Sequence, residues 1–478
     1  MIAGRLLLCV GVVAAMALGL GCEPKRDKTA WVNPLDVMEP RLAKDPKDNN
    51  YILQRMEFGR QAMLLGSDLR AKPRLMEAFD QLGAERDNTA AALTTEQLKY
   101  YKGETYERAM LTAYLGMLEY RAGQYNNARI LFSRALSADR AAVVNEKTPS
   151  SYGEDFGLAY FWISRAFAKL GDTDQTAIAL RKAAAGVDRL KNAEKELAAD
   201  RKAAADWEKM FLEGEKWSFQ TFSDPKEKDR FIEGIVDLSQ VRGTPGNPPA
   251  VAAASAKDNP VLKTTDNREE FFTAAYQNEA NTVLQLEVGW PPYKYLGGIN
   301  GERTEFGRPF VQPRTIRVYI DGHYAGPAFV VLDLWDQAST QDRIAEKDAA
   351  QAGKAVAKEI LKHMPYVGSA AGYWNVQGDI RFWTTLPGKM FLYAGKLAPG
   401  PHTVRLEMYD VGGNLLPRWT NTFYGLSVPK EGEAIISLAP HVDGDNRLPP
   451  DMVEKAMKAG ARPVAAFGMY GGHPGYAY

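Results

Sequence analysis

The 478-residue sequence predicts an α+β protein with a helical first half and a strand-rich second half. From position 51 to about 239, apolar residues recur every three or four positions, which is the period of amphipathic helices. In the second half, apolar and polar residues alternate, as in strands with one buried face. With 45% hydrophobic residues, a chain this long can form two cores. We therefore expect a helical solenoid followed by a mostly antiparallel, sandwich-like β domain with one long helix.

The N-terminus has the pattern of a bacterial lipoprotein signal. Arg5 precedes an apolar run over residues 6–20, and Gly21-Cys22 follows. The run is shorter than the roughly 20 apolar residues that span a bilayer, which favours a signal peptide over residues 1–21 rather than a membrane anchor. We expect lipid attachment at Cys22, which would tether the protein to the bacterial cell envelope. Because Glu23 follows rather than Asp, the periplasmic side of the outer membrane is the expected destination.

Composition marks the segments outside the two folded parts. Prolines interrupt any helical period over residues 22–50, so this segment is expected to be a tether. Residues 240–268 are rich in Gly, Pro, Ala and Ser and are predicted to be a linker between a helical domain (51–239) and a β-rich domain (269–440). Residues 441–478 are expected to be a partly disordered tail, because their last part, 468–478, is rich in glycine and has no periodicity. The 59 basic residues equal the 59 acidic ones, so nothing favours binding to nucleic acid.

An internal repeat occurs in the helical domain. Its clearest copy resembles the tetratricopeptide (TPR) helical hairpin, with large and small residues at the matching positions: Tyr114, Leu115, Gly116, Gly123, Tyr125, Ala128, Phe132 and Ala135. Weaker copies surround Gly66 and Gly171. These two glycines lie 57 and 48 residues from Gly123, rather than the roughly 34 of a regular array, so insertions separate three units. An ordinary helical bundle is the alternative interpretation.

The TPR resemblance implies a binding surface. In TPR proteins the first helix of each hairpin lines a concave groove. Arginine mixed with aromatic residues is typical of protein-binding hot spots, because guanidinium groups bind carboxylates and rings bury area. The residues placed in the groove are Arg60 and Met63 from the first unit, Met117, Tyr120 and Arg121 from the second, and Phe161, Arg165 and Lys169 from the third. Alternatively, Met and Phe at these positions are core residues.

Alternation in the second half predicts individual strands. The clearest cover residues 284–288, 316–320 and 404–408, and turn sequences such as Asp321-Gly322 separate them. Between the strands, an alanine-rich segment that begins near Ser339 and ends before Pro365 predicts the one long helix.

Motifs for catalysis are missing from the sequence. It contains no nucleophile elbow, P-loop, Gly-rich dinucleotide turn, HExxH or CxxC motif. None of the five histidines has a second one at helical ligand spacing. We therefore expect no catalytic residue, no metal and no cofactor. Aromatic residues in the second half could form a sugar- or peptide-binding face or pack in the core: Trp290, Tyr293, Tyr295, Trp374, Trp383 and Trp419.

Several segments together resemble a family of uncharacterised bacterial TPR-containing lipoproteins over about Tyr51 to Leu438. They are Tyr106–Met110, Tyr125–Ala135, Val283–Lys294, Val318–Gly322 and Arg381–Val404. The resemblance implies an extracytoplasmic lipoprotein with a TPR-like first half, a β-rich second half and no assigned reaction. The expected function is an adaptor or scaffold that binds other envelope proteins or peptides through the helical groove. The alternative is a cell-wall-related enzyme or activator whose β domain binds glycan or peptide.

Overall fold

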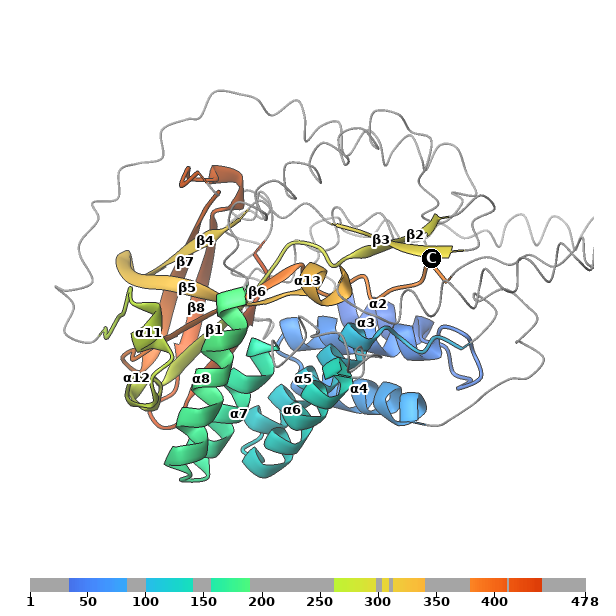
Figure 1. The fold of residues 1–478 in the computed structure, drawn as a ribbon, viewed down its shortest axis with the longest axis horizontal. Helices are drawn as coiled ribbons and strands as arrows, with labels where there is room; N and C mark the ends of the chain where they lie inside the picture. Colours follow the sequence, from blue (N-terminus) through green and yellow to red (C-terminus); the bar gives the residue numbers. More distant parts are fainter. Residues whose placement is uncertain are drawn as a thin grey trace, which may run out of the picture.

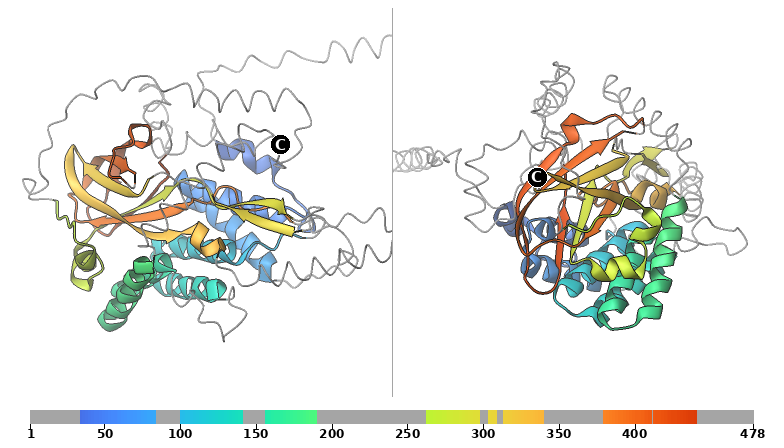
Figure 2. Two further views of the ribbon diagram at one scale, coloured as in Figure 1. Left: turned by 45° about the horizontal axis from the view of Figure 1, so that its top comes forward. Right: turned by 90° about the vertical axis from the view of Figure 1, so that its left-hand side faces the viewer.

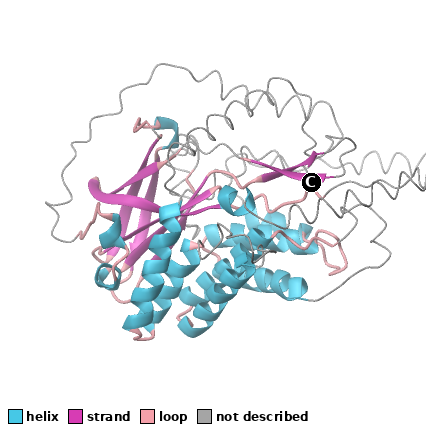
Figure 3. Ribbon diagram, in the orientation of Figure 1, coloured by secondary structure: helices cyan, strands magenta, loops and turns pink. Residues whose placement is uncertain are grey.

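The computed structural model combines a helical first half with a strand-rich second half, which confirms the α+β class (Figures 1 and 3). It describes residues 34–83, 100–140, 156–189, 262–297, 303–308, 313–339, 379–410 and 412–440. The predicted signal peptide, Cys22, the long helix after Ser339 and the C-terminal tail lie outside these residues. Among the helices in these ranges, none is long and apolar enough to cross a membrane.

Three helical hairpins make up the first half. They pair α3 (Tyr51–Leu64) with α4 (Asp68–Gly83), α5 (Thr105–Arg121) with α6 (Tyr125–Arg140), and α7 (Gly157–Lys169) with α8 (Thr173–Arg189). The first helix of each pair ends just before Gly66, Gly123 or Gly171, whose φ angles are 70°, 75° and 80°. A left-handed residue commonly follows a helix C-terminus, and glycine adopts this conformation without strain. The three glycines of the predicted repeat therefore occupy equivalent turns.

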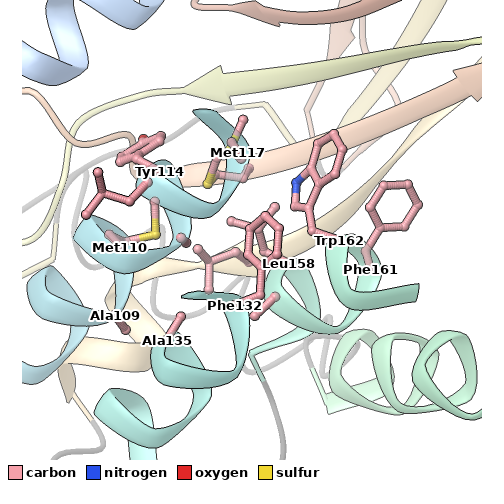
Figure 4. Close-up of a cluster of buried hydrophobic side chains, with 14 of the residues drawn as sticks. Ala109, Met110, Tyr114, Met117, Phe132, Ala135, Leu158, Phe161 and Trp162 are labelled. Atoms are coloured by element: carbon pink, nitrogen blue, oxygen red, sulfur yellow. The ribbon is translucent and has the colours of Figure 1, made fainter. Parts of the chain in front are cut away.

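Small residues allow the helices of the first two hairpins to approach closely. A Cβ atom on Gly116 would lie 2.8 Å from the Phe132 ring, and one on Gly59 would collide with a leucine of α4. Ala128 and Ala135 of α6 have no exposed surface. Figure 4 shows Phe132 and Trp162 together in this core, where their rings are nearly parallel with centroids 6.2 Å apart. The predicted use of small residues at helix contacts is confirmed.

The second half contains a seven-stranded sheet in the order β8-β7-β4-β5-β6-β1-β9. All neighbouring pairs are antiparallel except β1 with β9. A separate ribbon pairs β2 (Tyr293–Gly297) with β3 (Arg303–Gly307). The strands of the sheet are β1 (Thr282–Val288), β4 (Thr315–Ile320), β5 (His323–Asp333), β6 (Lys389–Gly395), β7 (Gly400–Tyr409), β8 (Asn421–Val428) and β9 (Ala434–Leu438). The three strands predicted from alternation are confirmed.

Short helices connect or flank these elements. They are α2 (Pro34–Met38), η1 (Glu39–Arg41), α11 (Arg268–Phe271), α12 (Ala274–Glu279), α13 (Leu334–Ser339) and η5 (Pro417–Trp419). The Asp321-Gly322 turn between β4 and β5 has φ angles of 52° and 84°, as the predicted hairpin turn requires.

The sheet folds over its own inner face. The first part of β5 pairs with β4 and the last part pairs with β6, and the pairing with β6 shifts register between Val330 and Leu332. Apolar side chains from β1, β6 and β9 share one buried cluster with those from β4, β7 and β8, and no residue of α3–α8 belongs to it. The two ends of the sheet therefore cover each other (Figure 2).

The helical layer packs on the other face of β1, β6 and β9. Side chains from these strands join the helical core: Val283, Met390, Leu392, Ala394 and Ile435. Every residue of the three strands is buried. The expectation of one solvent-exposed face therefore fails for β1, because helices cover the side that alternation assigned to solvent.

Parts of the predicted tether and linker are packed against the body. In the segment 34–41, which we call the strap, Leu35 has no exposed surface. Arg70 of α4 binds Asp36 at 2.8 Å and Glu39 at 2.6 Å. At the end of the predicted linker, Leu262 lies in the inner cluster of the sheet. Proline and glycine content indicated irregular structure here but did not reveal these contacts.

Candidate functional site

The residues predicted to line the groove do converge on one side of the helical layer, but the chain's own second half covers that side. We call these eight residues the groove face: Arg60, Met63, Met117, Tyr120, Arg121, Phe161, Arg165 and Lys169. The side chains of these residues are largely buried, except that of Lys169, which is 32% exposed. The expectation of an open groove is therefore corrected: the sheet and its flanking turns occupy it.

Arg60 is held by a buried carboxylate on β1. Its Nη2 atom lies 2.5 Å from Oε2 of Glu287, and the two side chains are 3% and 1% exposed. The Tyr114 hydroxyl donates to the same oxygen at 3.0 Å, and Gln285 donates to the other oxygen at 3.0 Å. Trp162 in turn donates to Gln285 at 3.3 Å. These hydrogen bonds offset the free-energy cost of removing the polar side chains of Gln285 and Glu287 from water. The alternating sequence pattern predicted that both side chains face solvent.

A second carboxylate lies at the start of β9. Arg165 binds Glu433 at 2.5 Å and also donates to the backbone carbonyl of Ala280 at 3.2 Å. Lys169 binds the same carboxylate at 2.9 Å, and the Tyr120 hydroxyl donates to it at 2.9 Å. Burial alone would raise the pKa of Glu433, but Arg165 and Lys169 outweigh it and lower the pKa below its usual value. Three residues of the groove face thus form a carboxylate site that this chain fills itself.

The other members of the groove face have structural contacts. Arg121 donates to Asp68 of α4 at 3.1 Å and to the Ser437 hydroxyl of β9 at 2.7 Å. Met63, Met117 and Phe161 belong to the helical core, as the alternative interpretation of their sequence positions held: they are at most 2% exposed.

A third polar contact joins the N-terminus of α5 to the β-rich half. Lys294 of β2 binds Glu104 at 2.7 Å. Glu107 accepts hydrogen bonds from the backbone of Glu104 at 2.5 Å and of Trp383 at 2.6 Å. Burial raises the pKa of Glu107, although the charge of Lys294 opposes the rise. The cluster lies within the interface between the halves and positions the α5 N-terminus.

The aromatic residues predicted from the second half have different environments. Trp383 has no exposed surface and its ring lies edge-on to that of Tyr114, with centroids 5.8 Å apart, so it is a core residue. Trp290 and Tyr295 are 42% and 38% exposed. Trp419 is partly buried against the inner cluster of the sheet. Trp374 lies outside the described residues.

Sequence reasoning did not single out a surface on the outer side of β4, β5, β7 and β8. The residues here alternate with apolar ones that enter the inner cluster. Tyrosine and arginine predominate, so we call it the tyrosine face: Arg317, Tyr319, Tyr324, Arg405, Glu407, Tyr409 and Tyr424. The alternating pattern of the predicted strands at 316–320 and 404–408 already distinguished several of these residues from core residues. It is the sequence signal from which this surface could have been found.

The tyrosine face is internally ordered. The Arg317 guanidinium lies 4.6 Å from the centroid of the Tyr409 ring. Tyr409 donates to Glu407 at 2.9 Å, and Arg405 binds the other oxygen of Glu407 at 3.0 Å. Partial burial and the bond to Glu407 raise the pKa of Tyr409 to about 12, so its hydroxyl stays protonated at neutral pH. These contacts hold the side chains of this half-buried to exposed sheet face in place.

Within the described ranges, no group of three His, Cys, Asp or Glu side chains is arranged to hold a metal ion.

A hollow of about 340 Å³ lies between α4, α5 and α6. Its lining is chiefly apolar, with Asp80, Arg108 and Arg134 beside Phe79, Leu82 and Leu111. The Arg134 guanidinium lies 5.7 Å from the Phe79 ring centroid, so this arginine packs against the wall of the hollow.

No protein-family model and no curated protein sequence matches the chain. Among solved structures, the crystal structure of BtubC (BKLC) from P. vanneervenii is similar to 31% of this chain at 13% sequence identity, with a TM-score of 0.22. The matched region spans 50% of the length of that protein. A TM-score this low carries no argument about fold or function.

Proposed function

We propose that this protein is a lipid-anchored adaptor or scaffold of the bacterial envelope that binds other proteins through the tyrosine face. The N-terminal signal pattern and Cys22 support the anchor and the envelope location. The observation that carries the adaptor function is a half-buried to exposed sheet face with four tyrosines and two arginines, the residue types that dominate protein-binding hot spots.

The closed groove directs binding away from the helices. A peptide in the groove would have to displace Glu287 and Glu433, which already bind Arg60 and Arg165. Displacement would leave buried charges without partners, which is costly. In this proposal the helical layer serves as a support that fixes the sheet, and the opposite side of the sheet faces the partner.

We propose further that the helical half is a TPR-like solenoid and the folded-over sheet a sandwich-like domain. Three hairpins with equivalent glycine turns support the first assignment, and a shared inner cluster supports the second. No observation on the described residues favours the alternative function, a cell-wall-related enzyme or activator.

Two experiments test the proposal. Replacing Cys22 by alanine should abolish fatty-acid labelling of the protein and release it from the membrane fraction; unchanged labelling would contradict the anchor.

The adaptor function is tested by crosslinking in cells. A photo-crosslinking amino acid replaces Tyr424 in the membrane-tethered protein. Tyr424 is 49% exposed, and Ile130 of α6, 40% exposed, serves as the matched control position. We expect a reproducible protein adduct from position 424 and none from 130. Equal adducts from both positions, or none from either, would contradict the proposal.

A further inference from the structure

We infer that the tyrosine face binds an acidic segment of a partner protein, and that Arg317 binds its carboxylate. The inference rests on the proposed adaptor function and adds the chemistry of the partner.

Strand register places the members of the face side by side. Tyr319 of β4 lies opposite Tyr324 of β5 on one side and Arg405 of β7 on the other. The next outward position of β4 is Arg317, opposite Glu407. Because residues two apart on a strand share a face, these side chains form one continuous surface.

The charges of this surface leave one cation without an anionic partner. Glu407 is occupied on both oxygens, by Arg405 at 3.0 Å and by Tyr409 at 2.9 Å. Within the part of the chain that the structure describes, no carboxylate pairs with Arg317. Its contacts are with tyrosines: it lies over the ring of Tyr409 and donates to the Tyr409 hydroxyl at 3.5 Å. A stacked guanidinium is restrained and weakly hydrated. It therefore loses less conformational entropy and less hydration on binding a carboxylate than the ammonium group of a mobile lysine would.

Composition and ring geometry favour a protein over a glycan as the source of that carboxylate. The four strands contain no lysine. Protein interfaces are enriched in tyrosine and arginine and depleted in lysine. The rings of Tyr319 and Tyr324, with centroids 5.5 Å apart, are inclined at 58°, so they do not form the flat platform on which a sugar ring would stack.

The test measures binding of fluorescent decaglutamate to the purified full-length chain, with decaglutamine as the neutral control probe. We expect binding to decaglutamate alone, weakening as salt is raised. Arg317→Ala should weaken it about tenfold or more, since a charged hydrogen bond is lost. Arg317→Lys should restore only part of the affinity. The matched control is Arg129→Ala, because Arg129 of α6 also stacks on a ring, that of Phe167, at 5.5 Å, but lies away from the sheet.

Several results would overturn the inference. They are equal binding by wild type and Arg317→Ala, equal loss in Arg129→Ala, and tighter binding of hyaluronate, a carboxylated glycan, than of decaglutamate. Melting temperatures check that each variant is folded, and Arg317→Gln replaces the alanine variant if that one is not. If the adduct from position 424 persists while decaglutamate does not bind, the adaptor function stands and the carboxylate inference falls.

Discussion

Replacing Arg60 by methionine is expected to lower the free energy of unfolding by about 3–5 kcal/mol. The change removes the cation that lies 2.5 Å from Glu287, whose side chain is 1% exposed. Tyr114 and Gln285 still donate to the carboxylate, but both are neutral. A loss of this size is a large part of the roughly 5–15 kcal/mol that stabilises a typical domain, so it is readily measured.

Urea unfolding followed by tryptophan fluorescence gives the measurement, since the chain has nine tryptophans. The double variant Arg60→Met with Glu287→Leu should recover most of the loss, because apolar residues can replace a buried ion pair with little net change. Lys263→Met is the control: Lys263 binds Glu279 at 2.8 Å on the surface, with side chains 36% and 53% exposed, so its urea midpoint should stay close to wild type.

Two outcomes would refute this reasoning. One is an Arg60→Met variant that unfolds like the Lys263→Met control. The other is a double variant that is no more stable than Arg60→Met alone. Either would show that the buried ion pair does not hold the helical layer on the sheet.

Three further predictions concern helix packing, pH and the strap. Gly116→Leu should lower stability by about 1–3 kcal/mol, since the new side chain meets the Phe132 ring, and an unchanged melting curve would refute the close contact. Because the pKa of Glu433 is lowered from 4.5 in the folded protein, its contribution to stability is present at neutral pH and is lost as pH falls through the lowered pKa. Glu433→Gln should therefore lose less stability than wild type between pH 7 and pH 3 in thermal melts; parallel losses would count against the carboxylate site. Glu39→Lys should release the strap from Arg70, which limited proteolysis would detect as faster cleavage near residue 40, whereas wild-type cleavage rates would show that the ion pair does not hold it.

Local sequence signals were sufficient for the hairpins and the clearest strands. Gly66, Gly123 and Gly171 marked the turns because a left-handed conformation after a helix favours glycine whatever surrounds it. Alternation located β4 and β7 because a strand with one covered face repeats every two residues. Both signals depend only on neighbours along the chain.

Alternation did not reveal what covers the second face of a strand. Gln285 and Glu287 of β1 have the polar character of an exposed face, yet they are buried against helices. These polar side chains are tolerated in the interior because Trp162 donates a hydrogen bond to Gln285 and Arg60 donates one to Glu287. A polar residue with buried partners and one in water look the same in the sequence.

The sequence by itself determined the α+β class, the hairpin turns and the positions of several strands. Only the tertiary structure decided what occupies that side. Arg60 and Glu287 are 227 positions apart and Arg165 and Glu433 are 268 apart. Contacts at such separations depend on how whole layers pack, which periodicity along the chain does not encode. For the same reason the tertiary structure defines the tyrosine face, because helices cover the outer side of β1, β6 and β9 and leave that of β4, β5, β7 and β8.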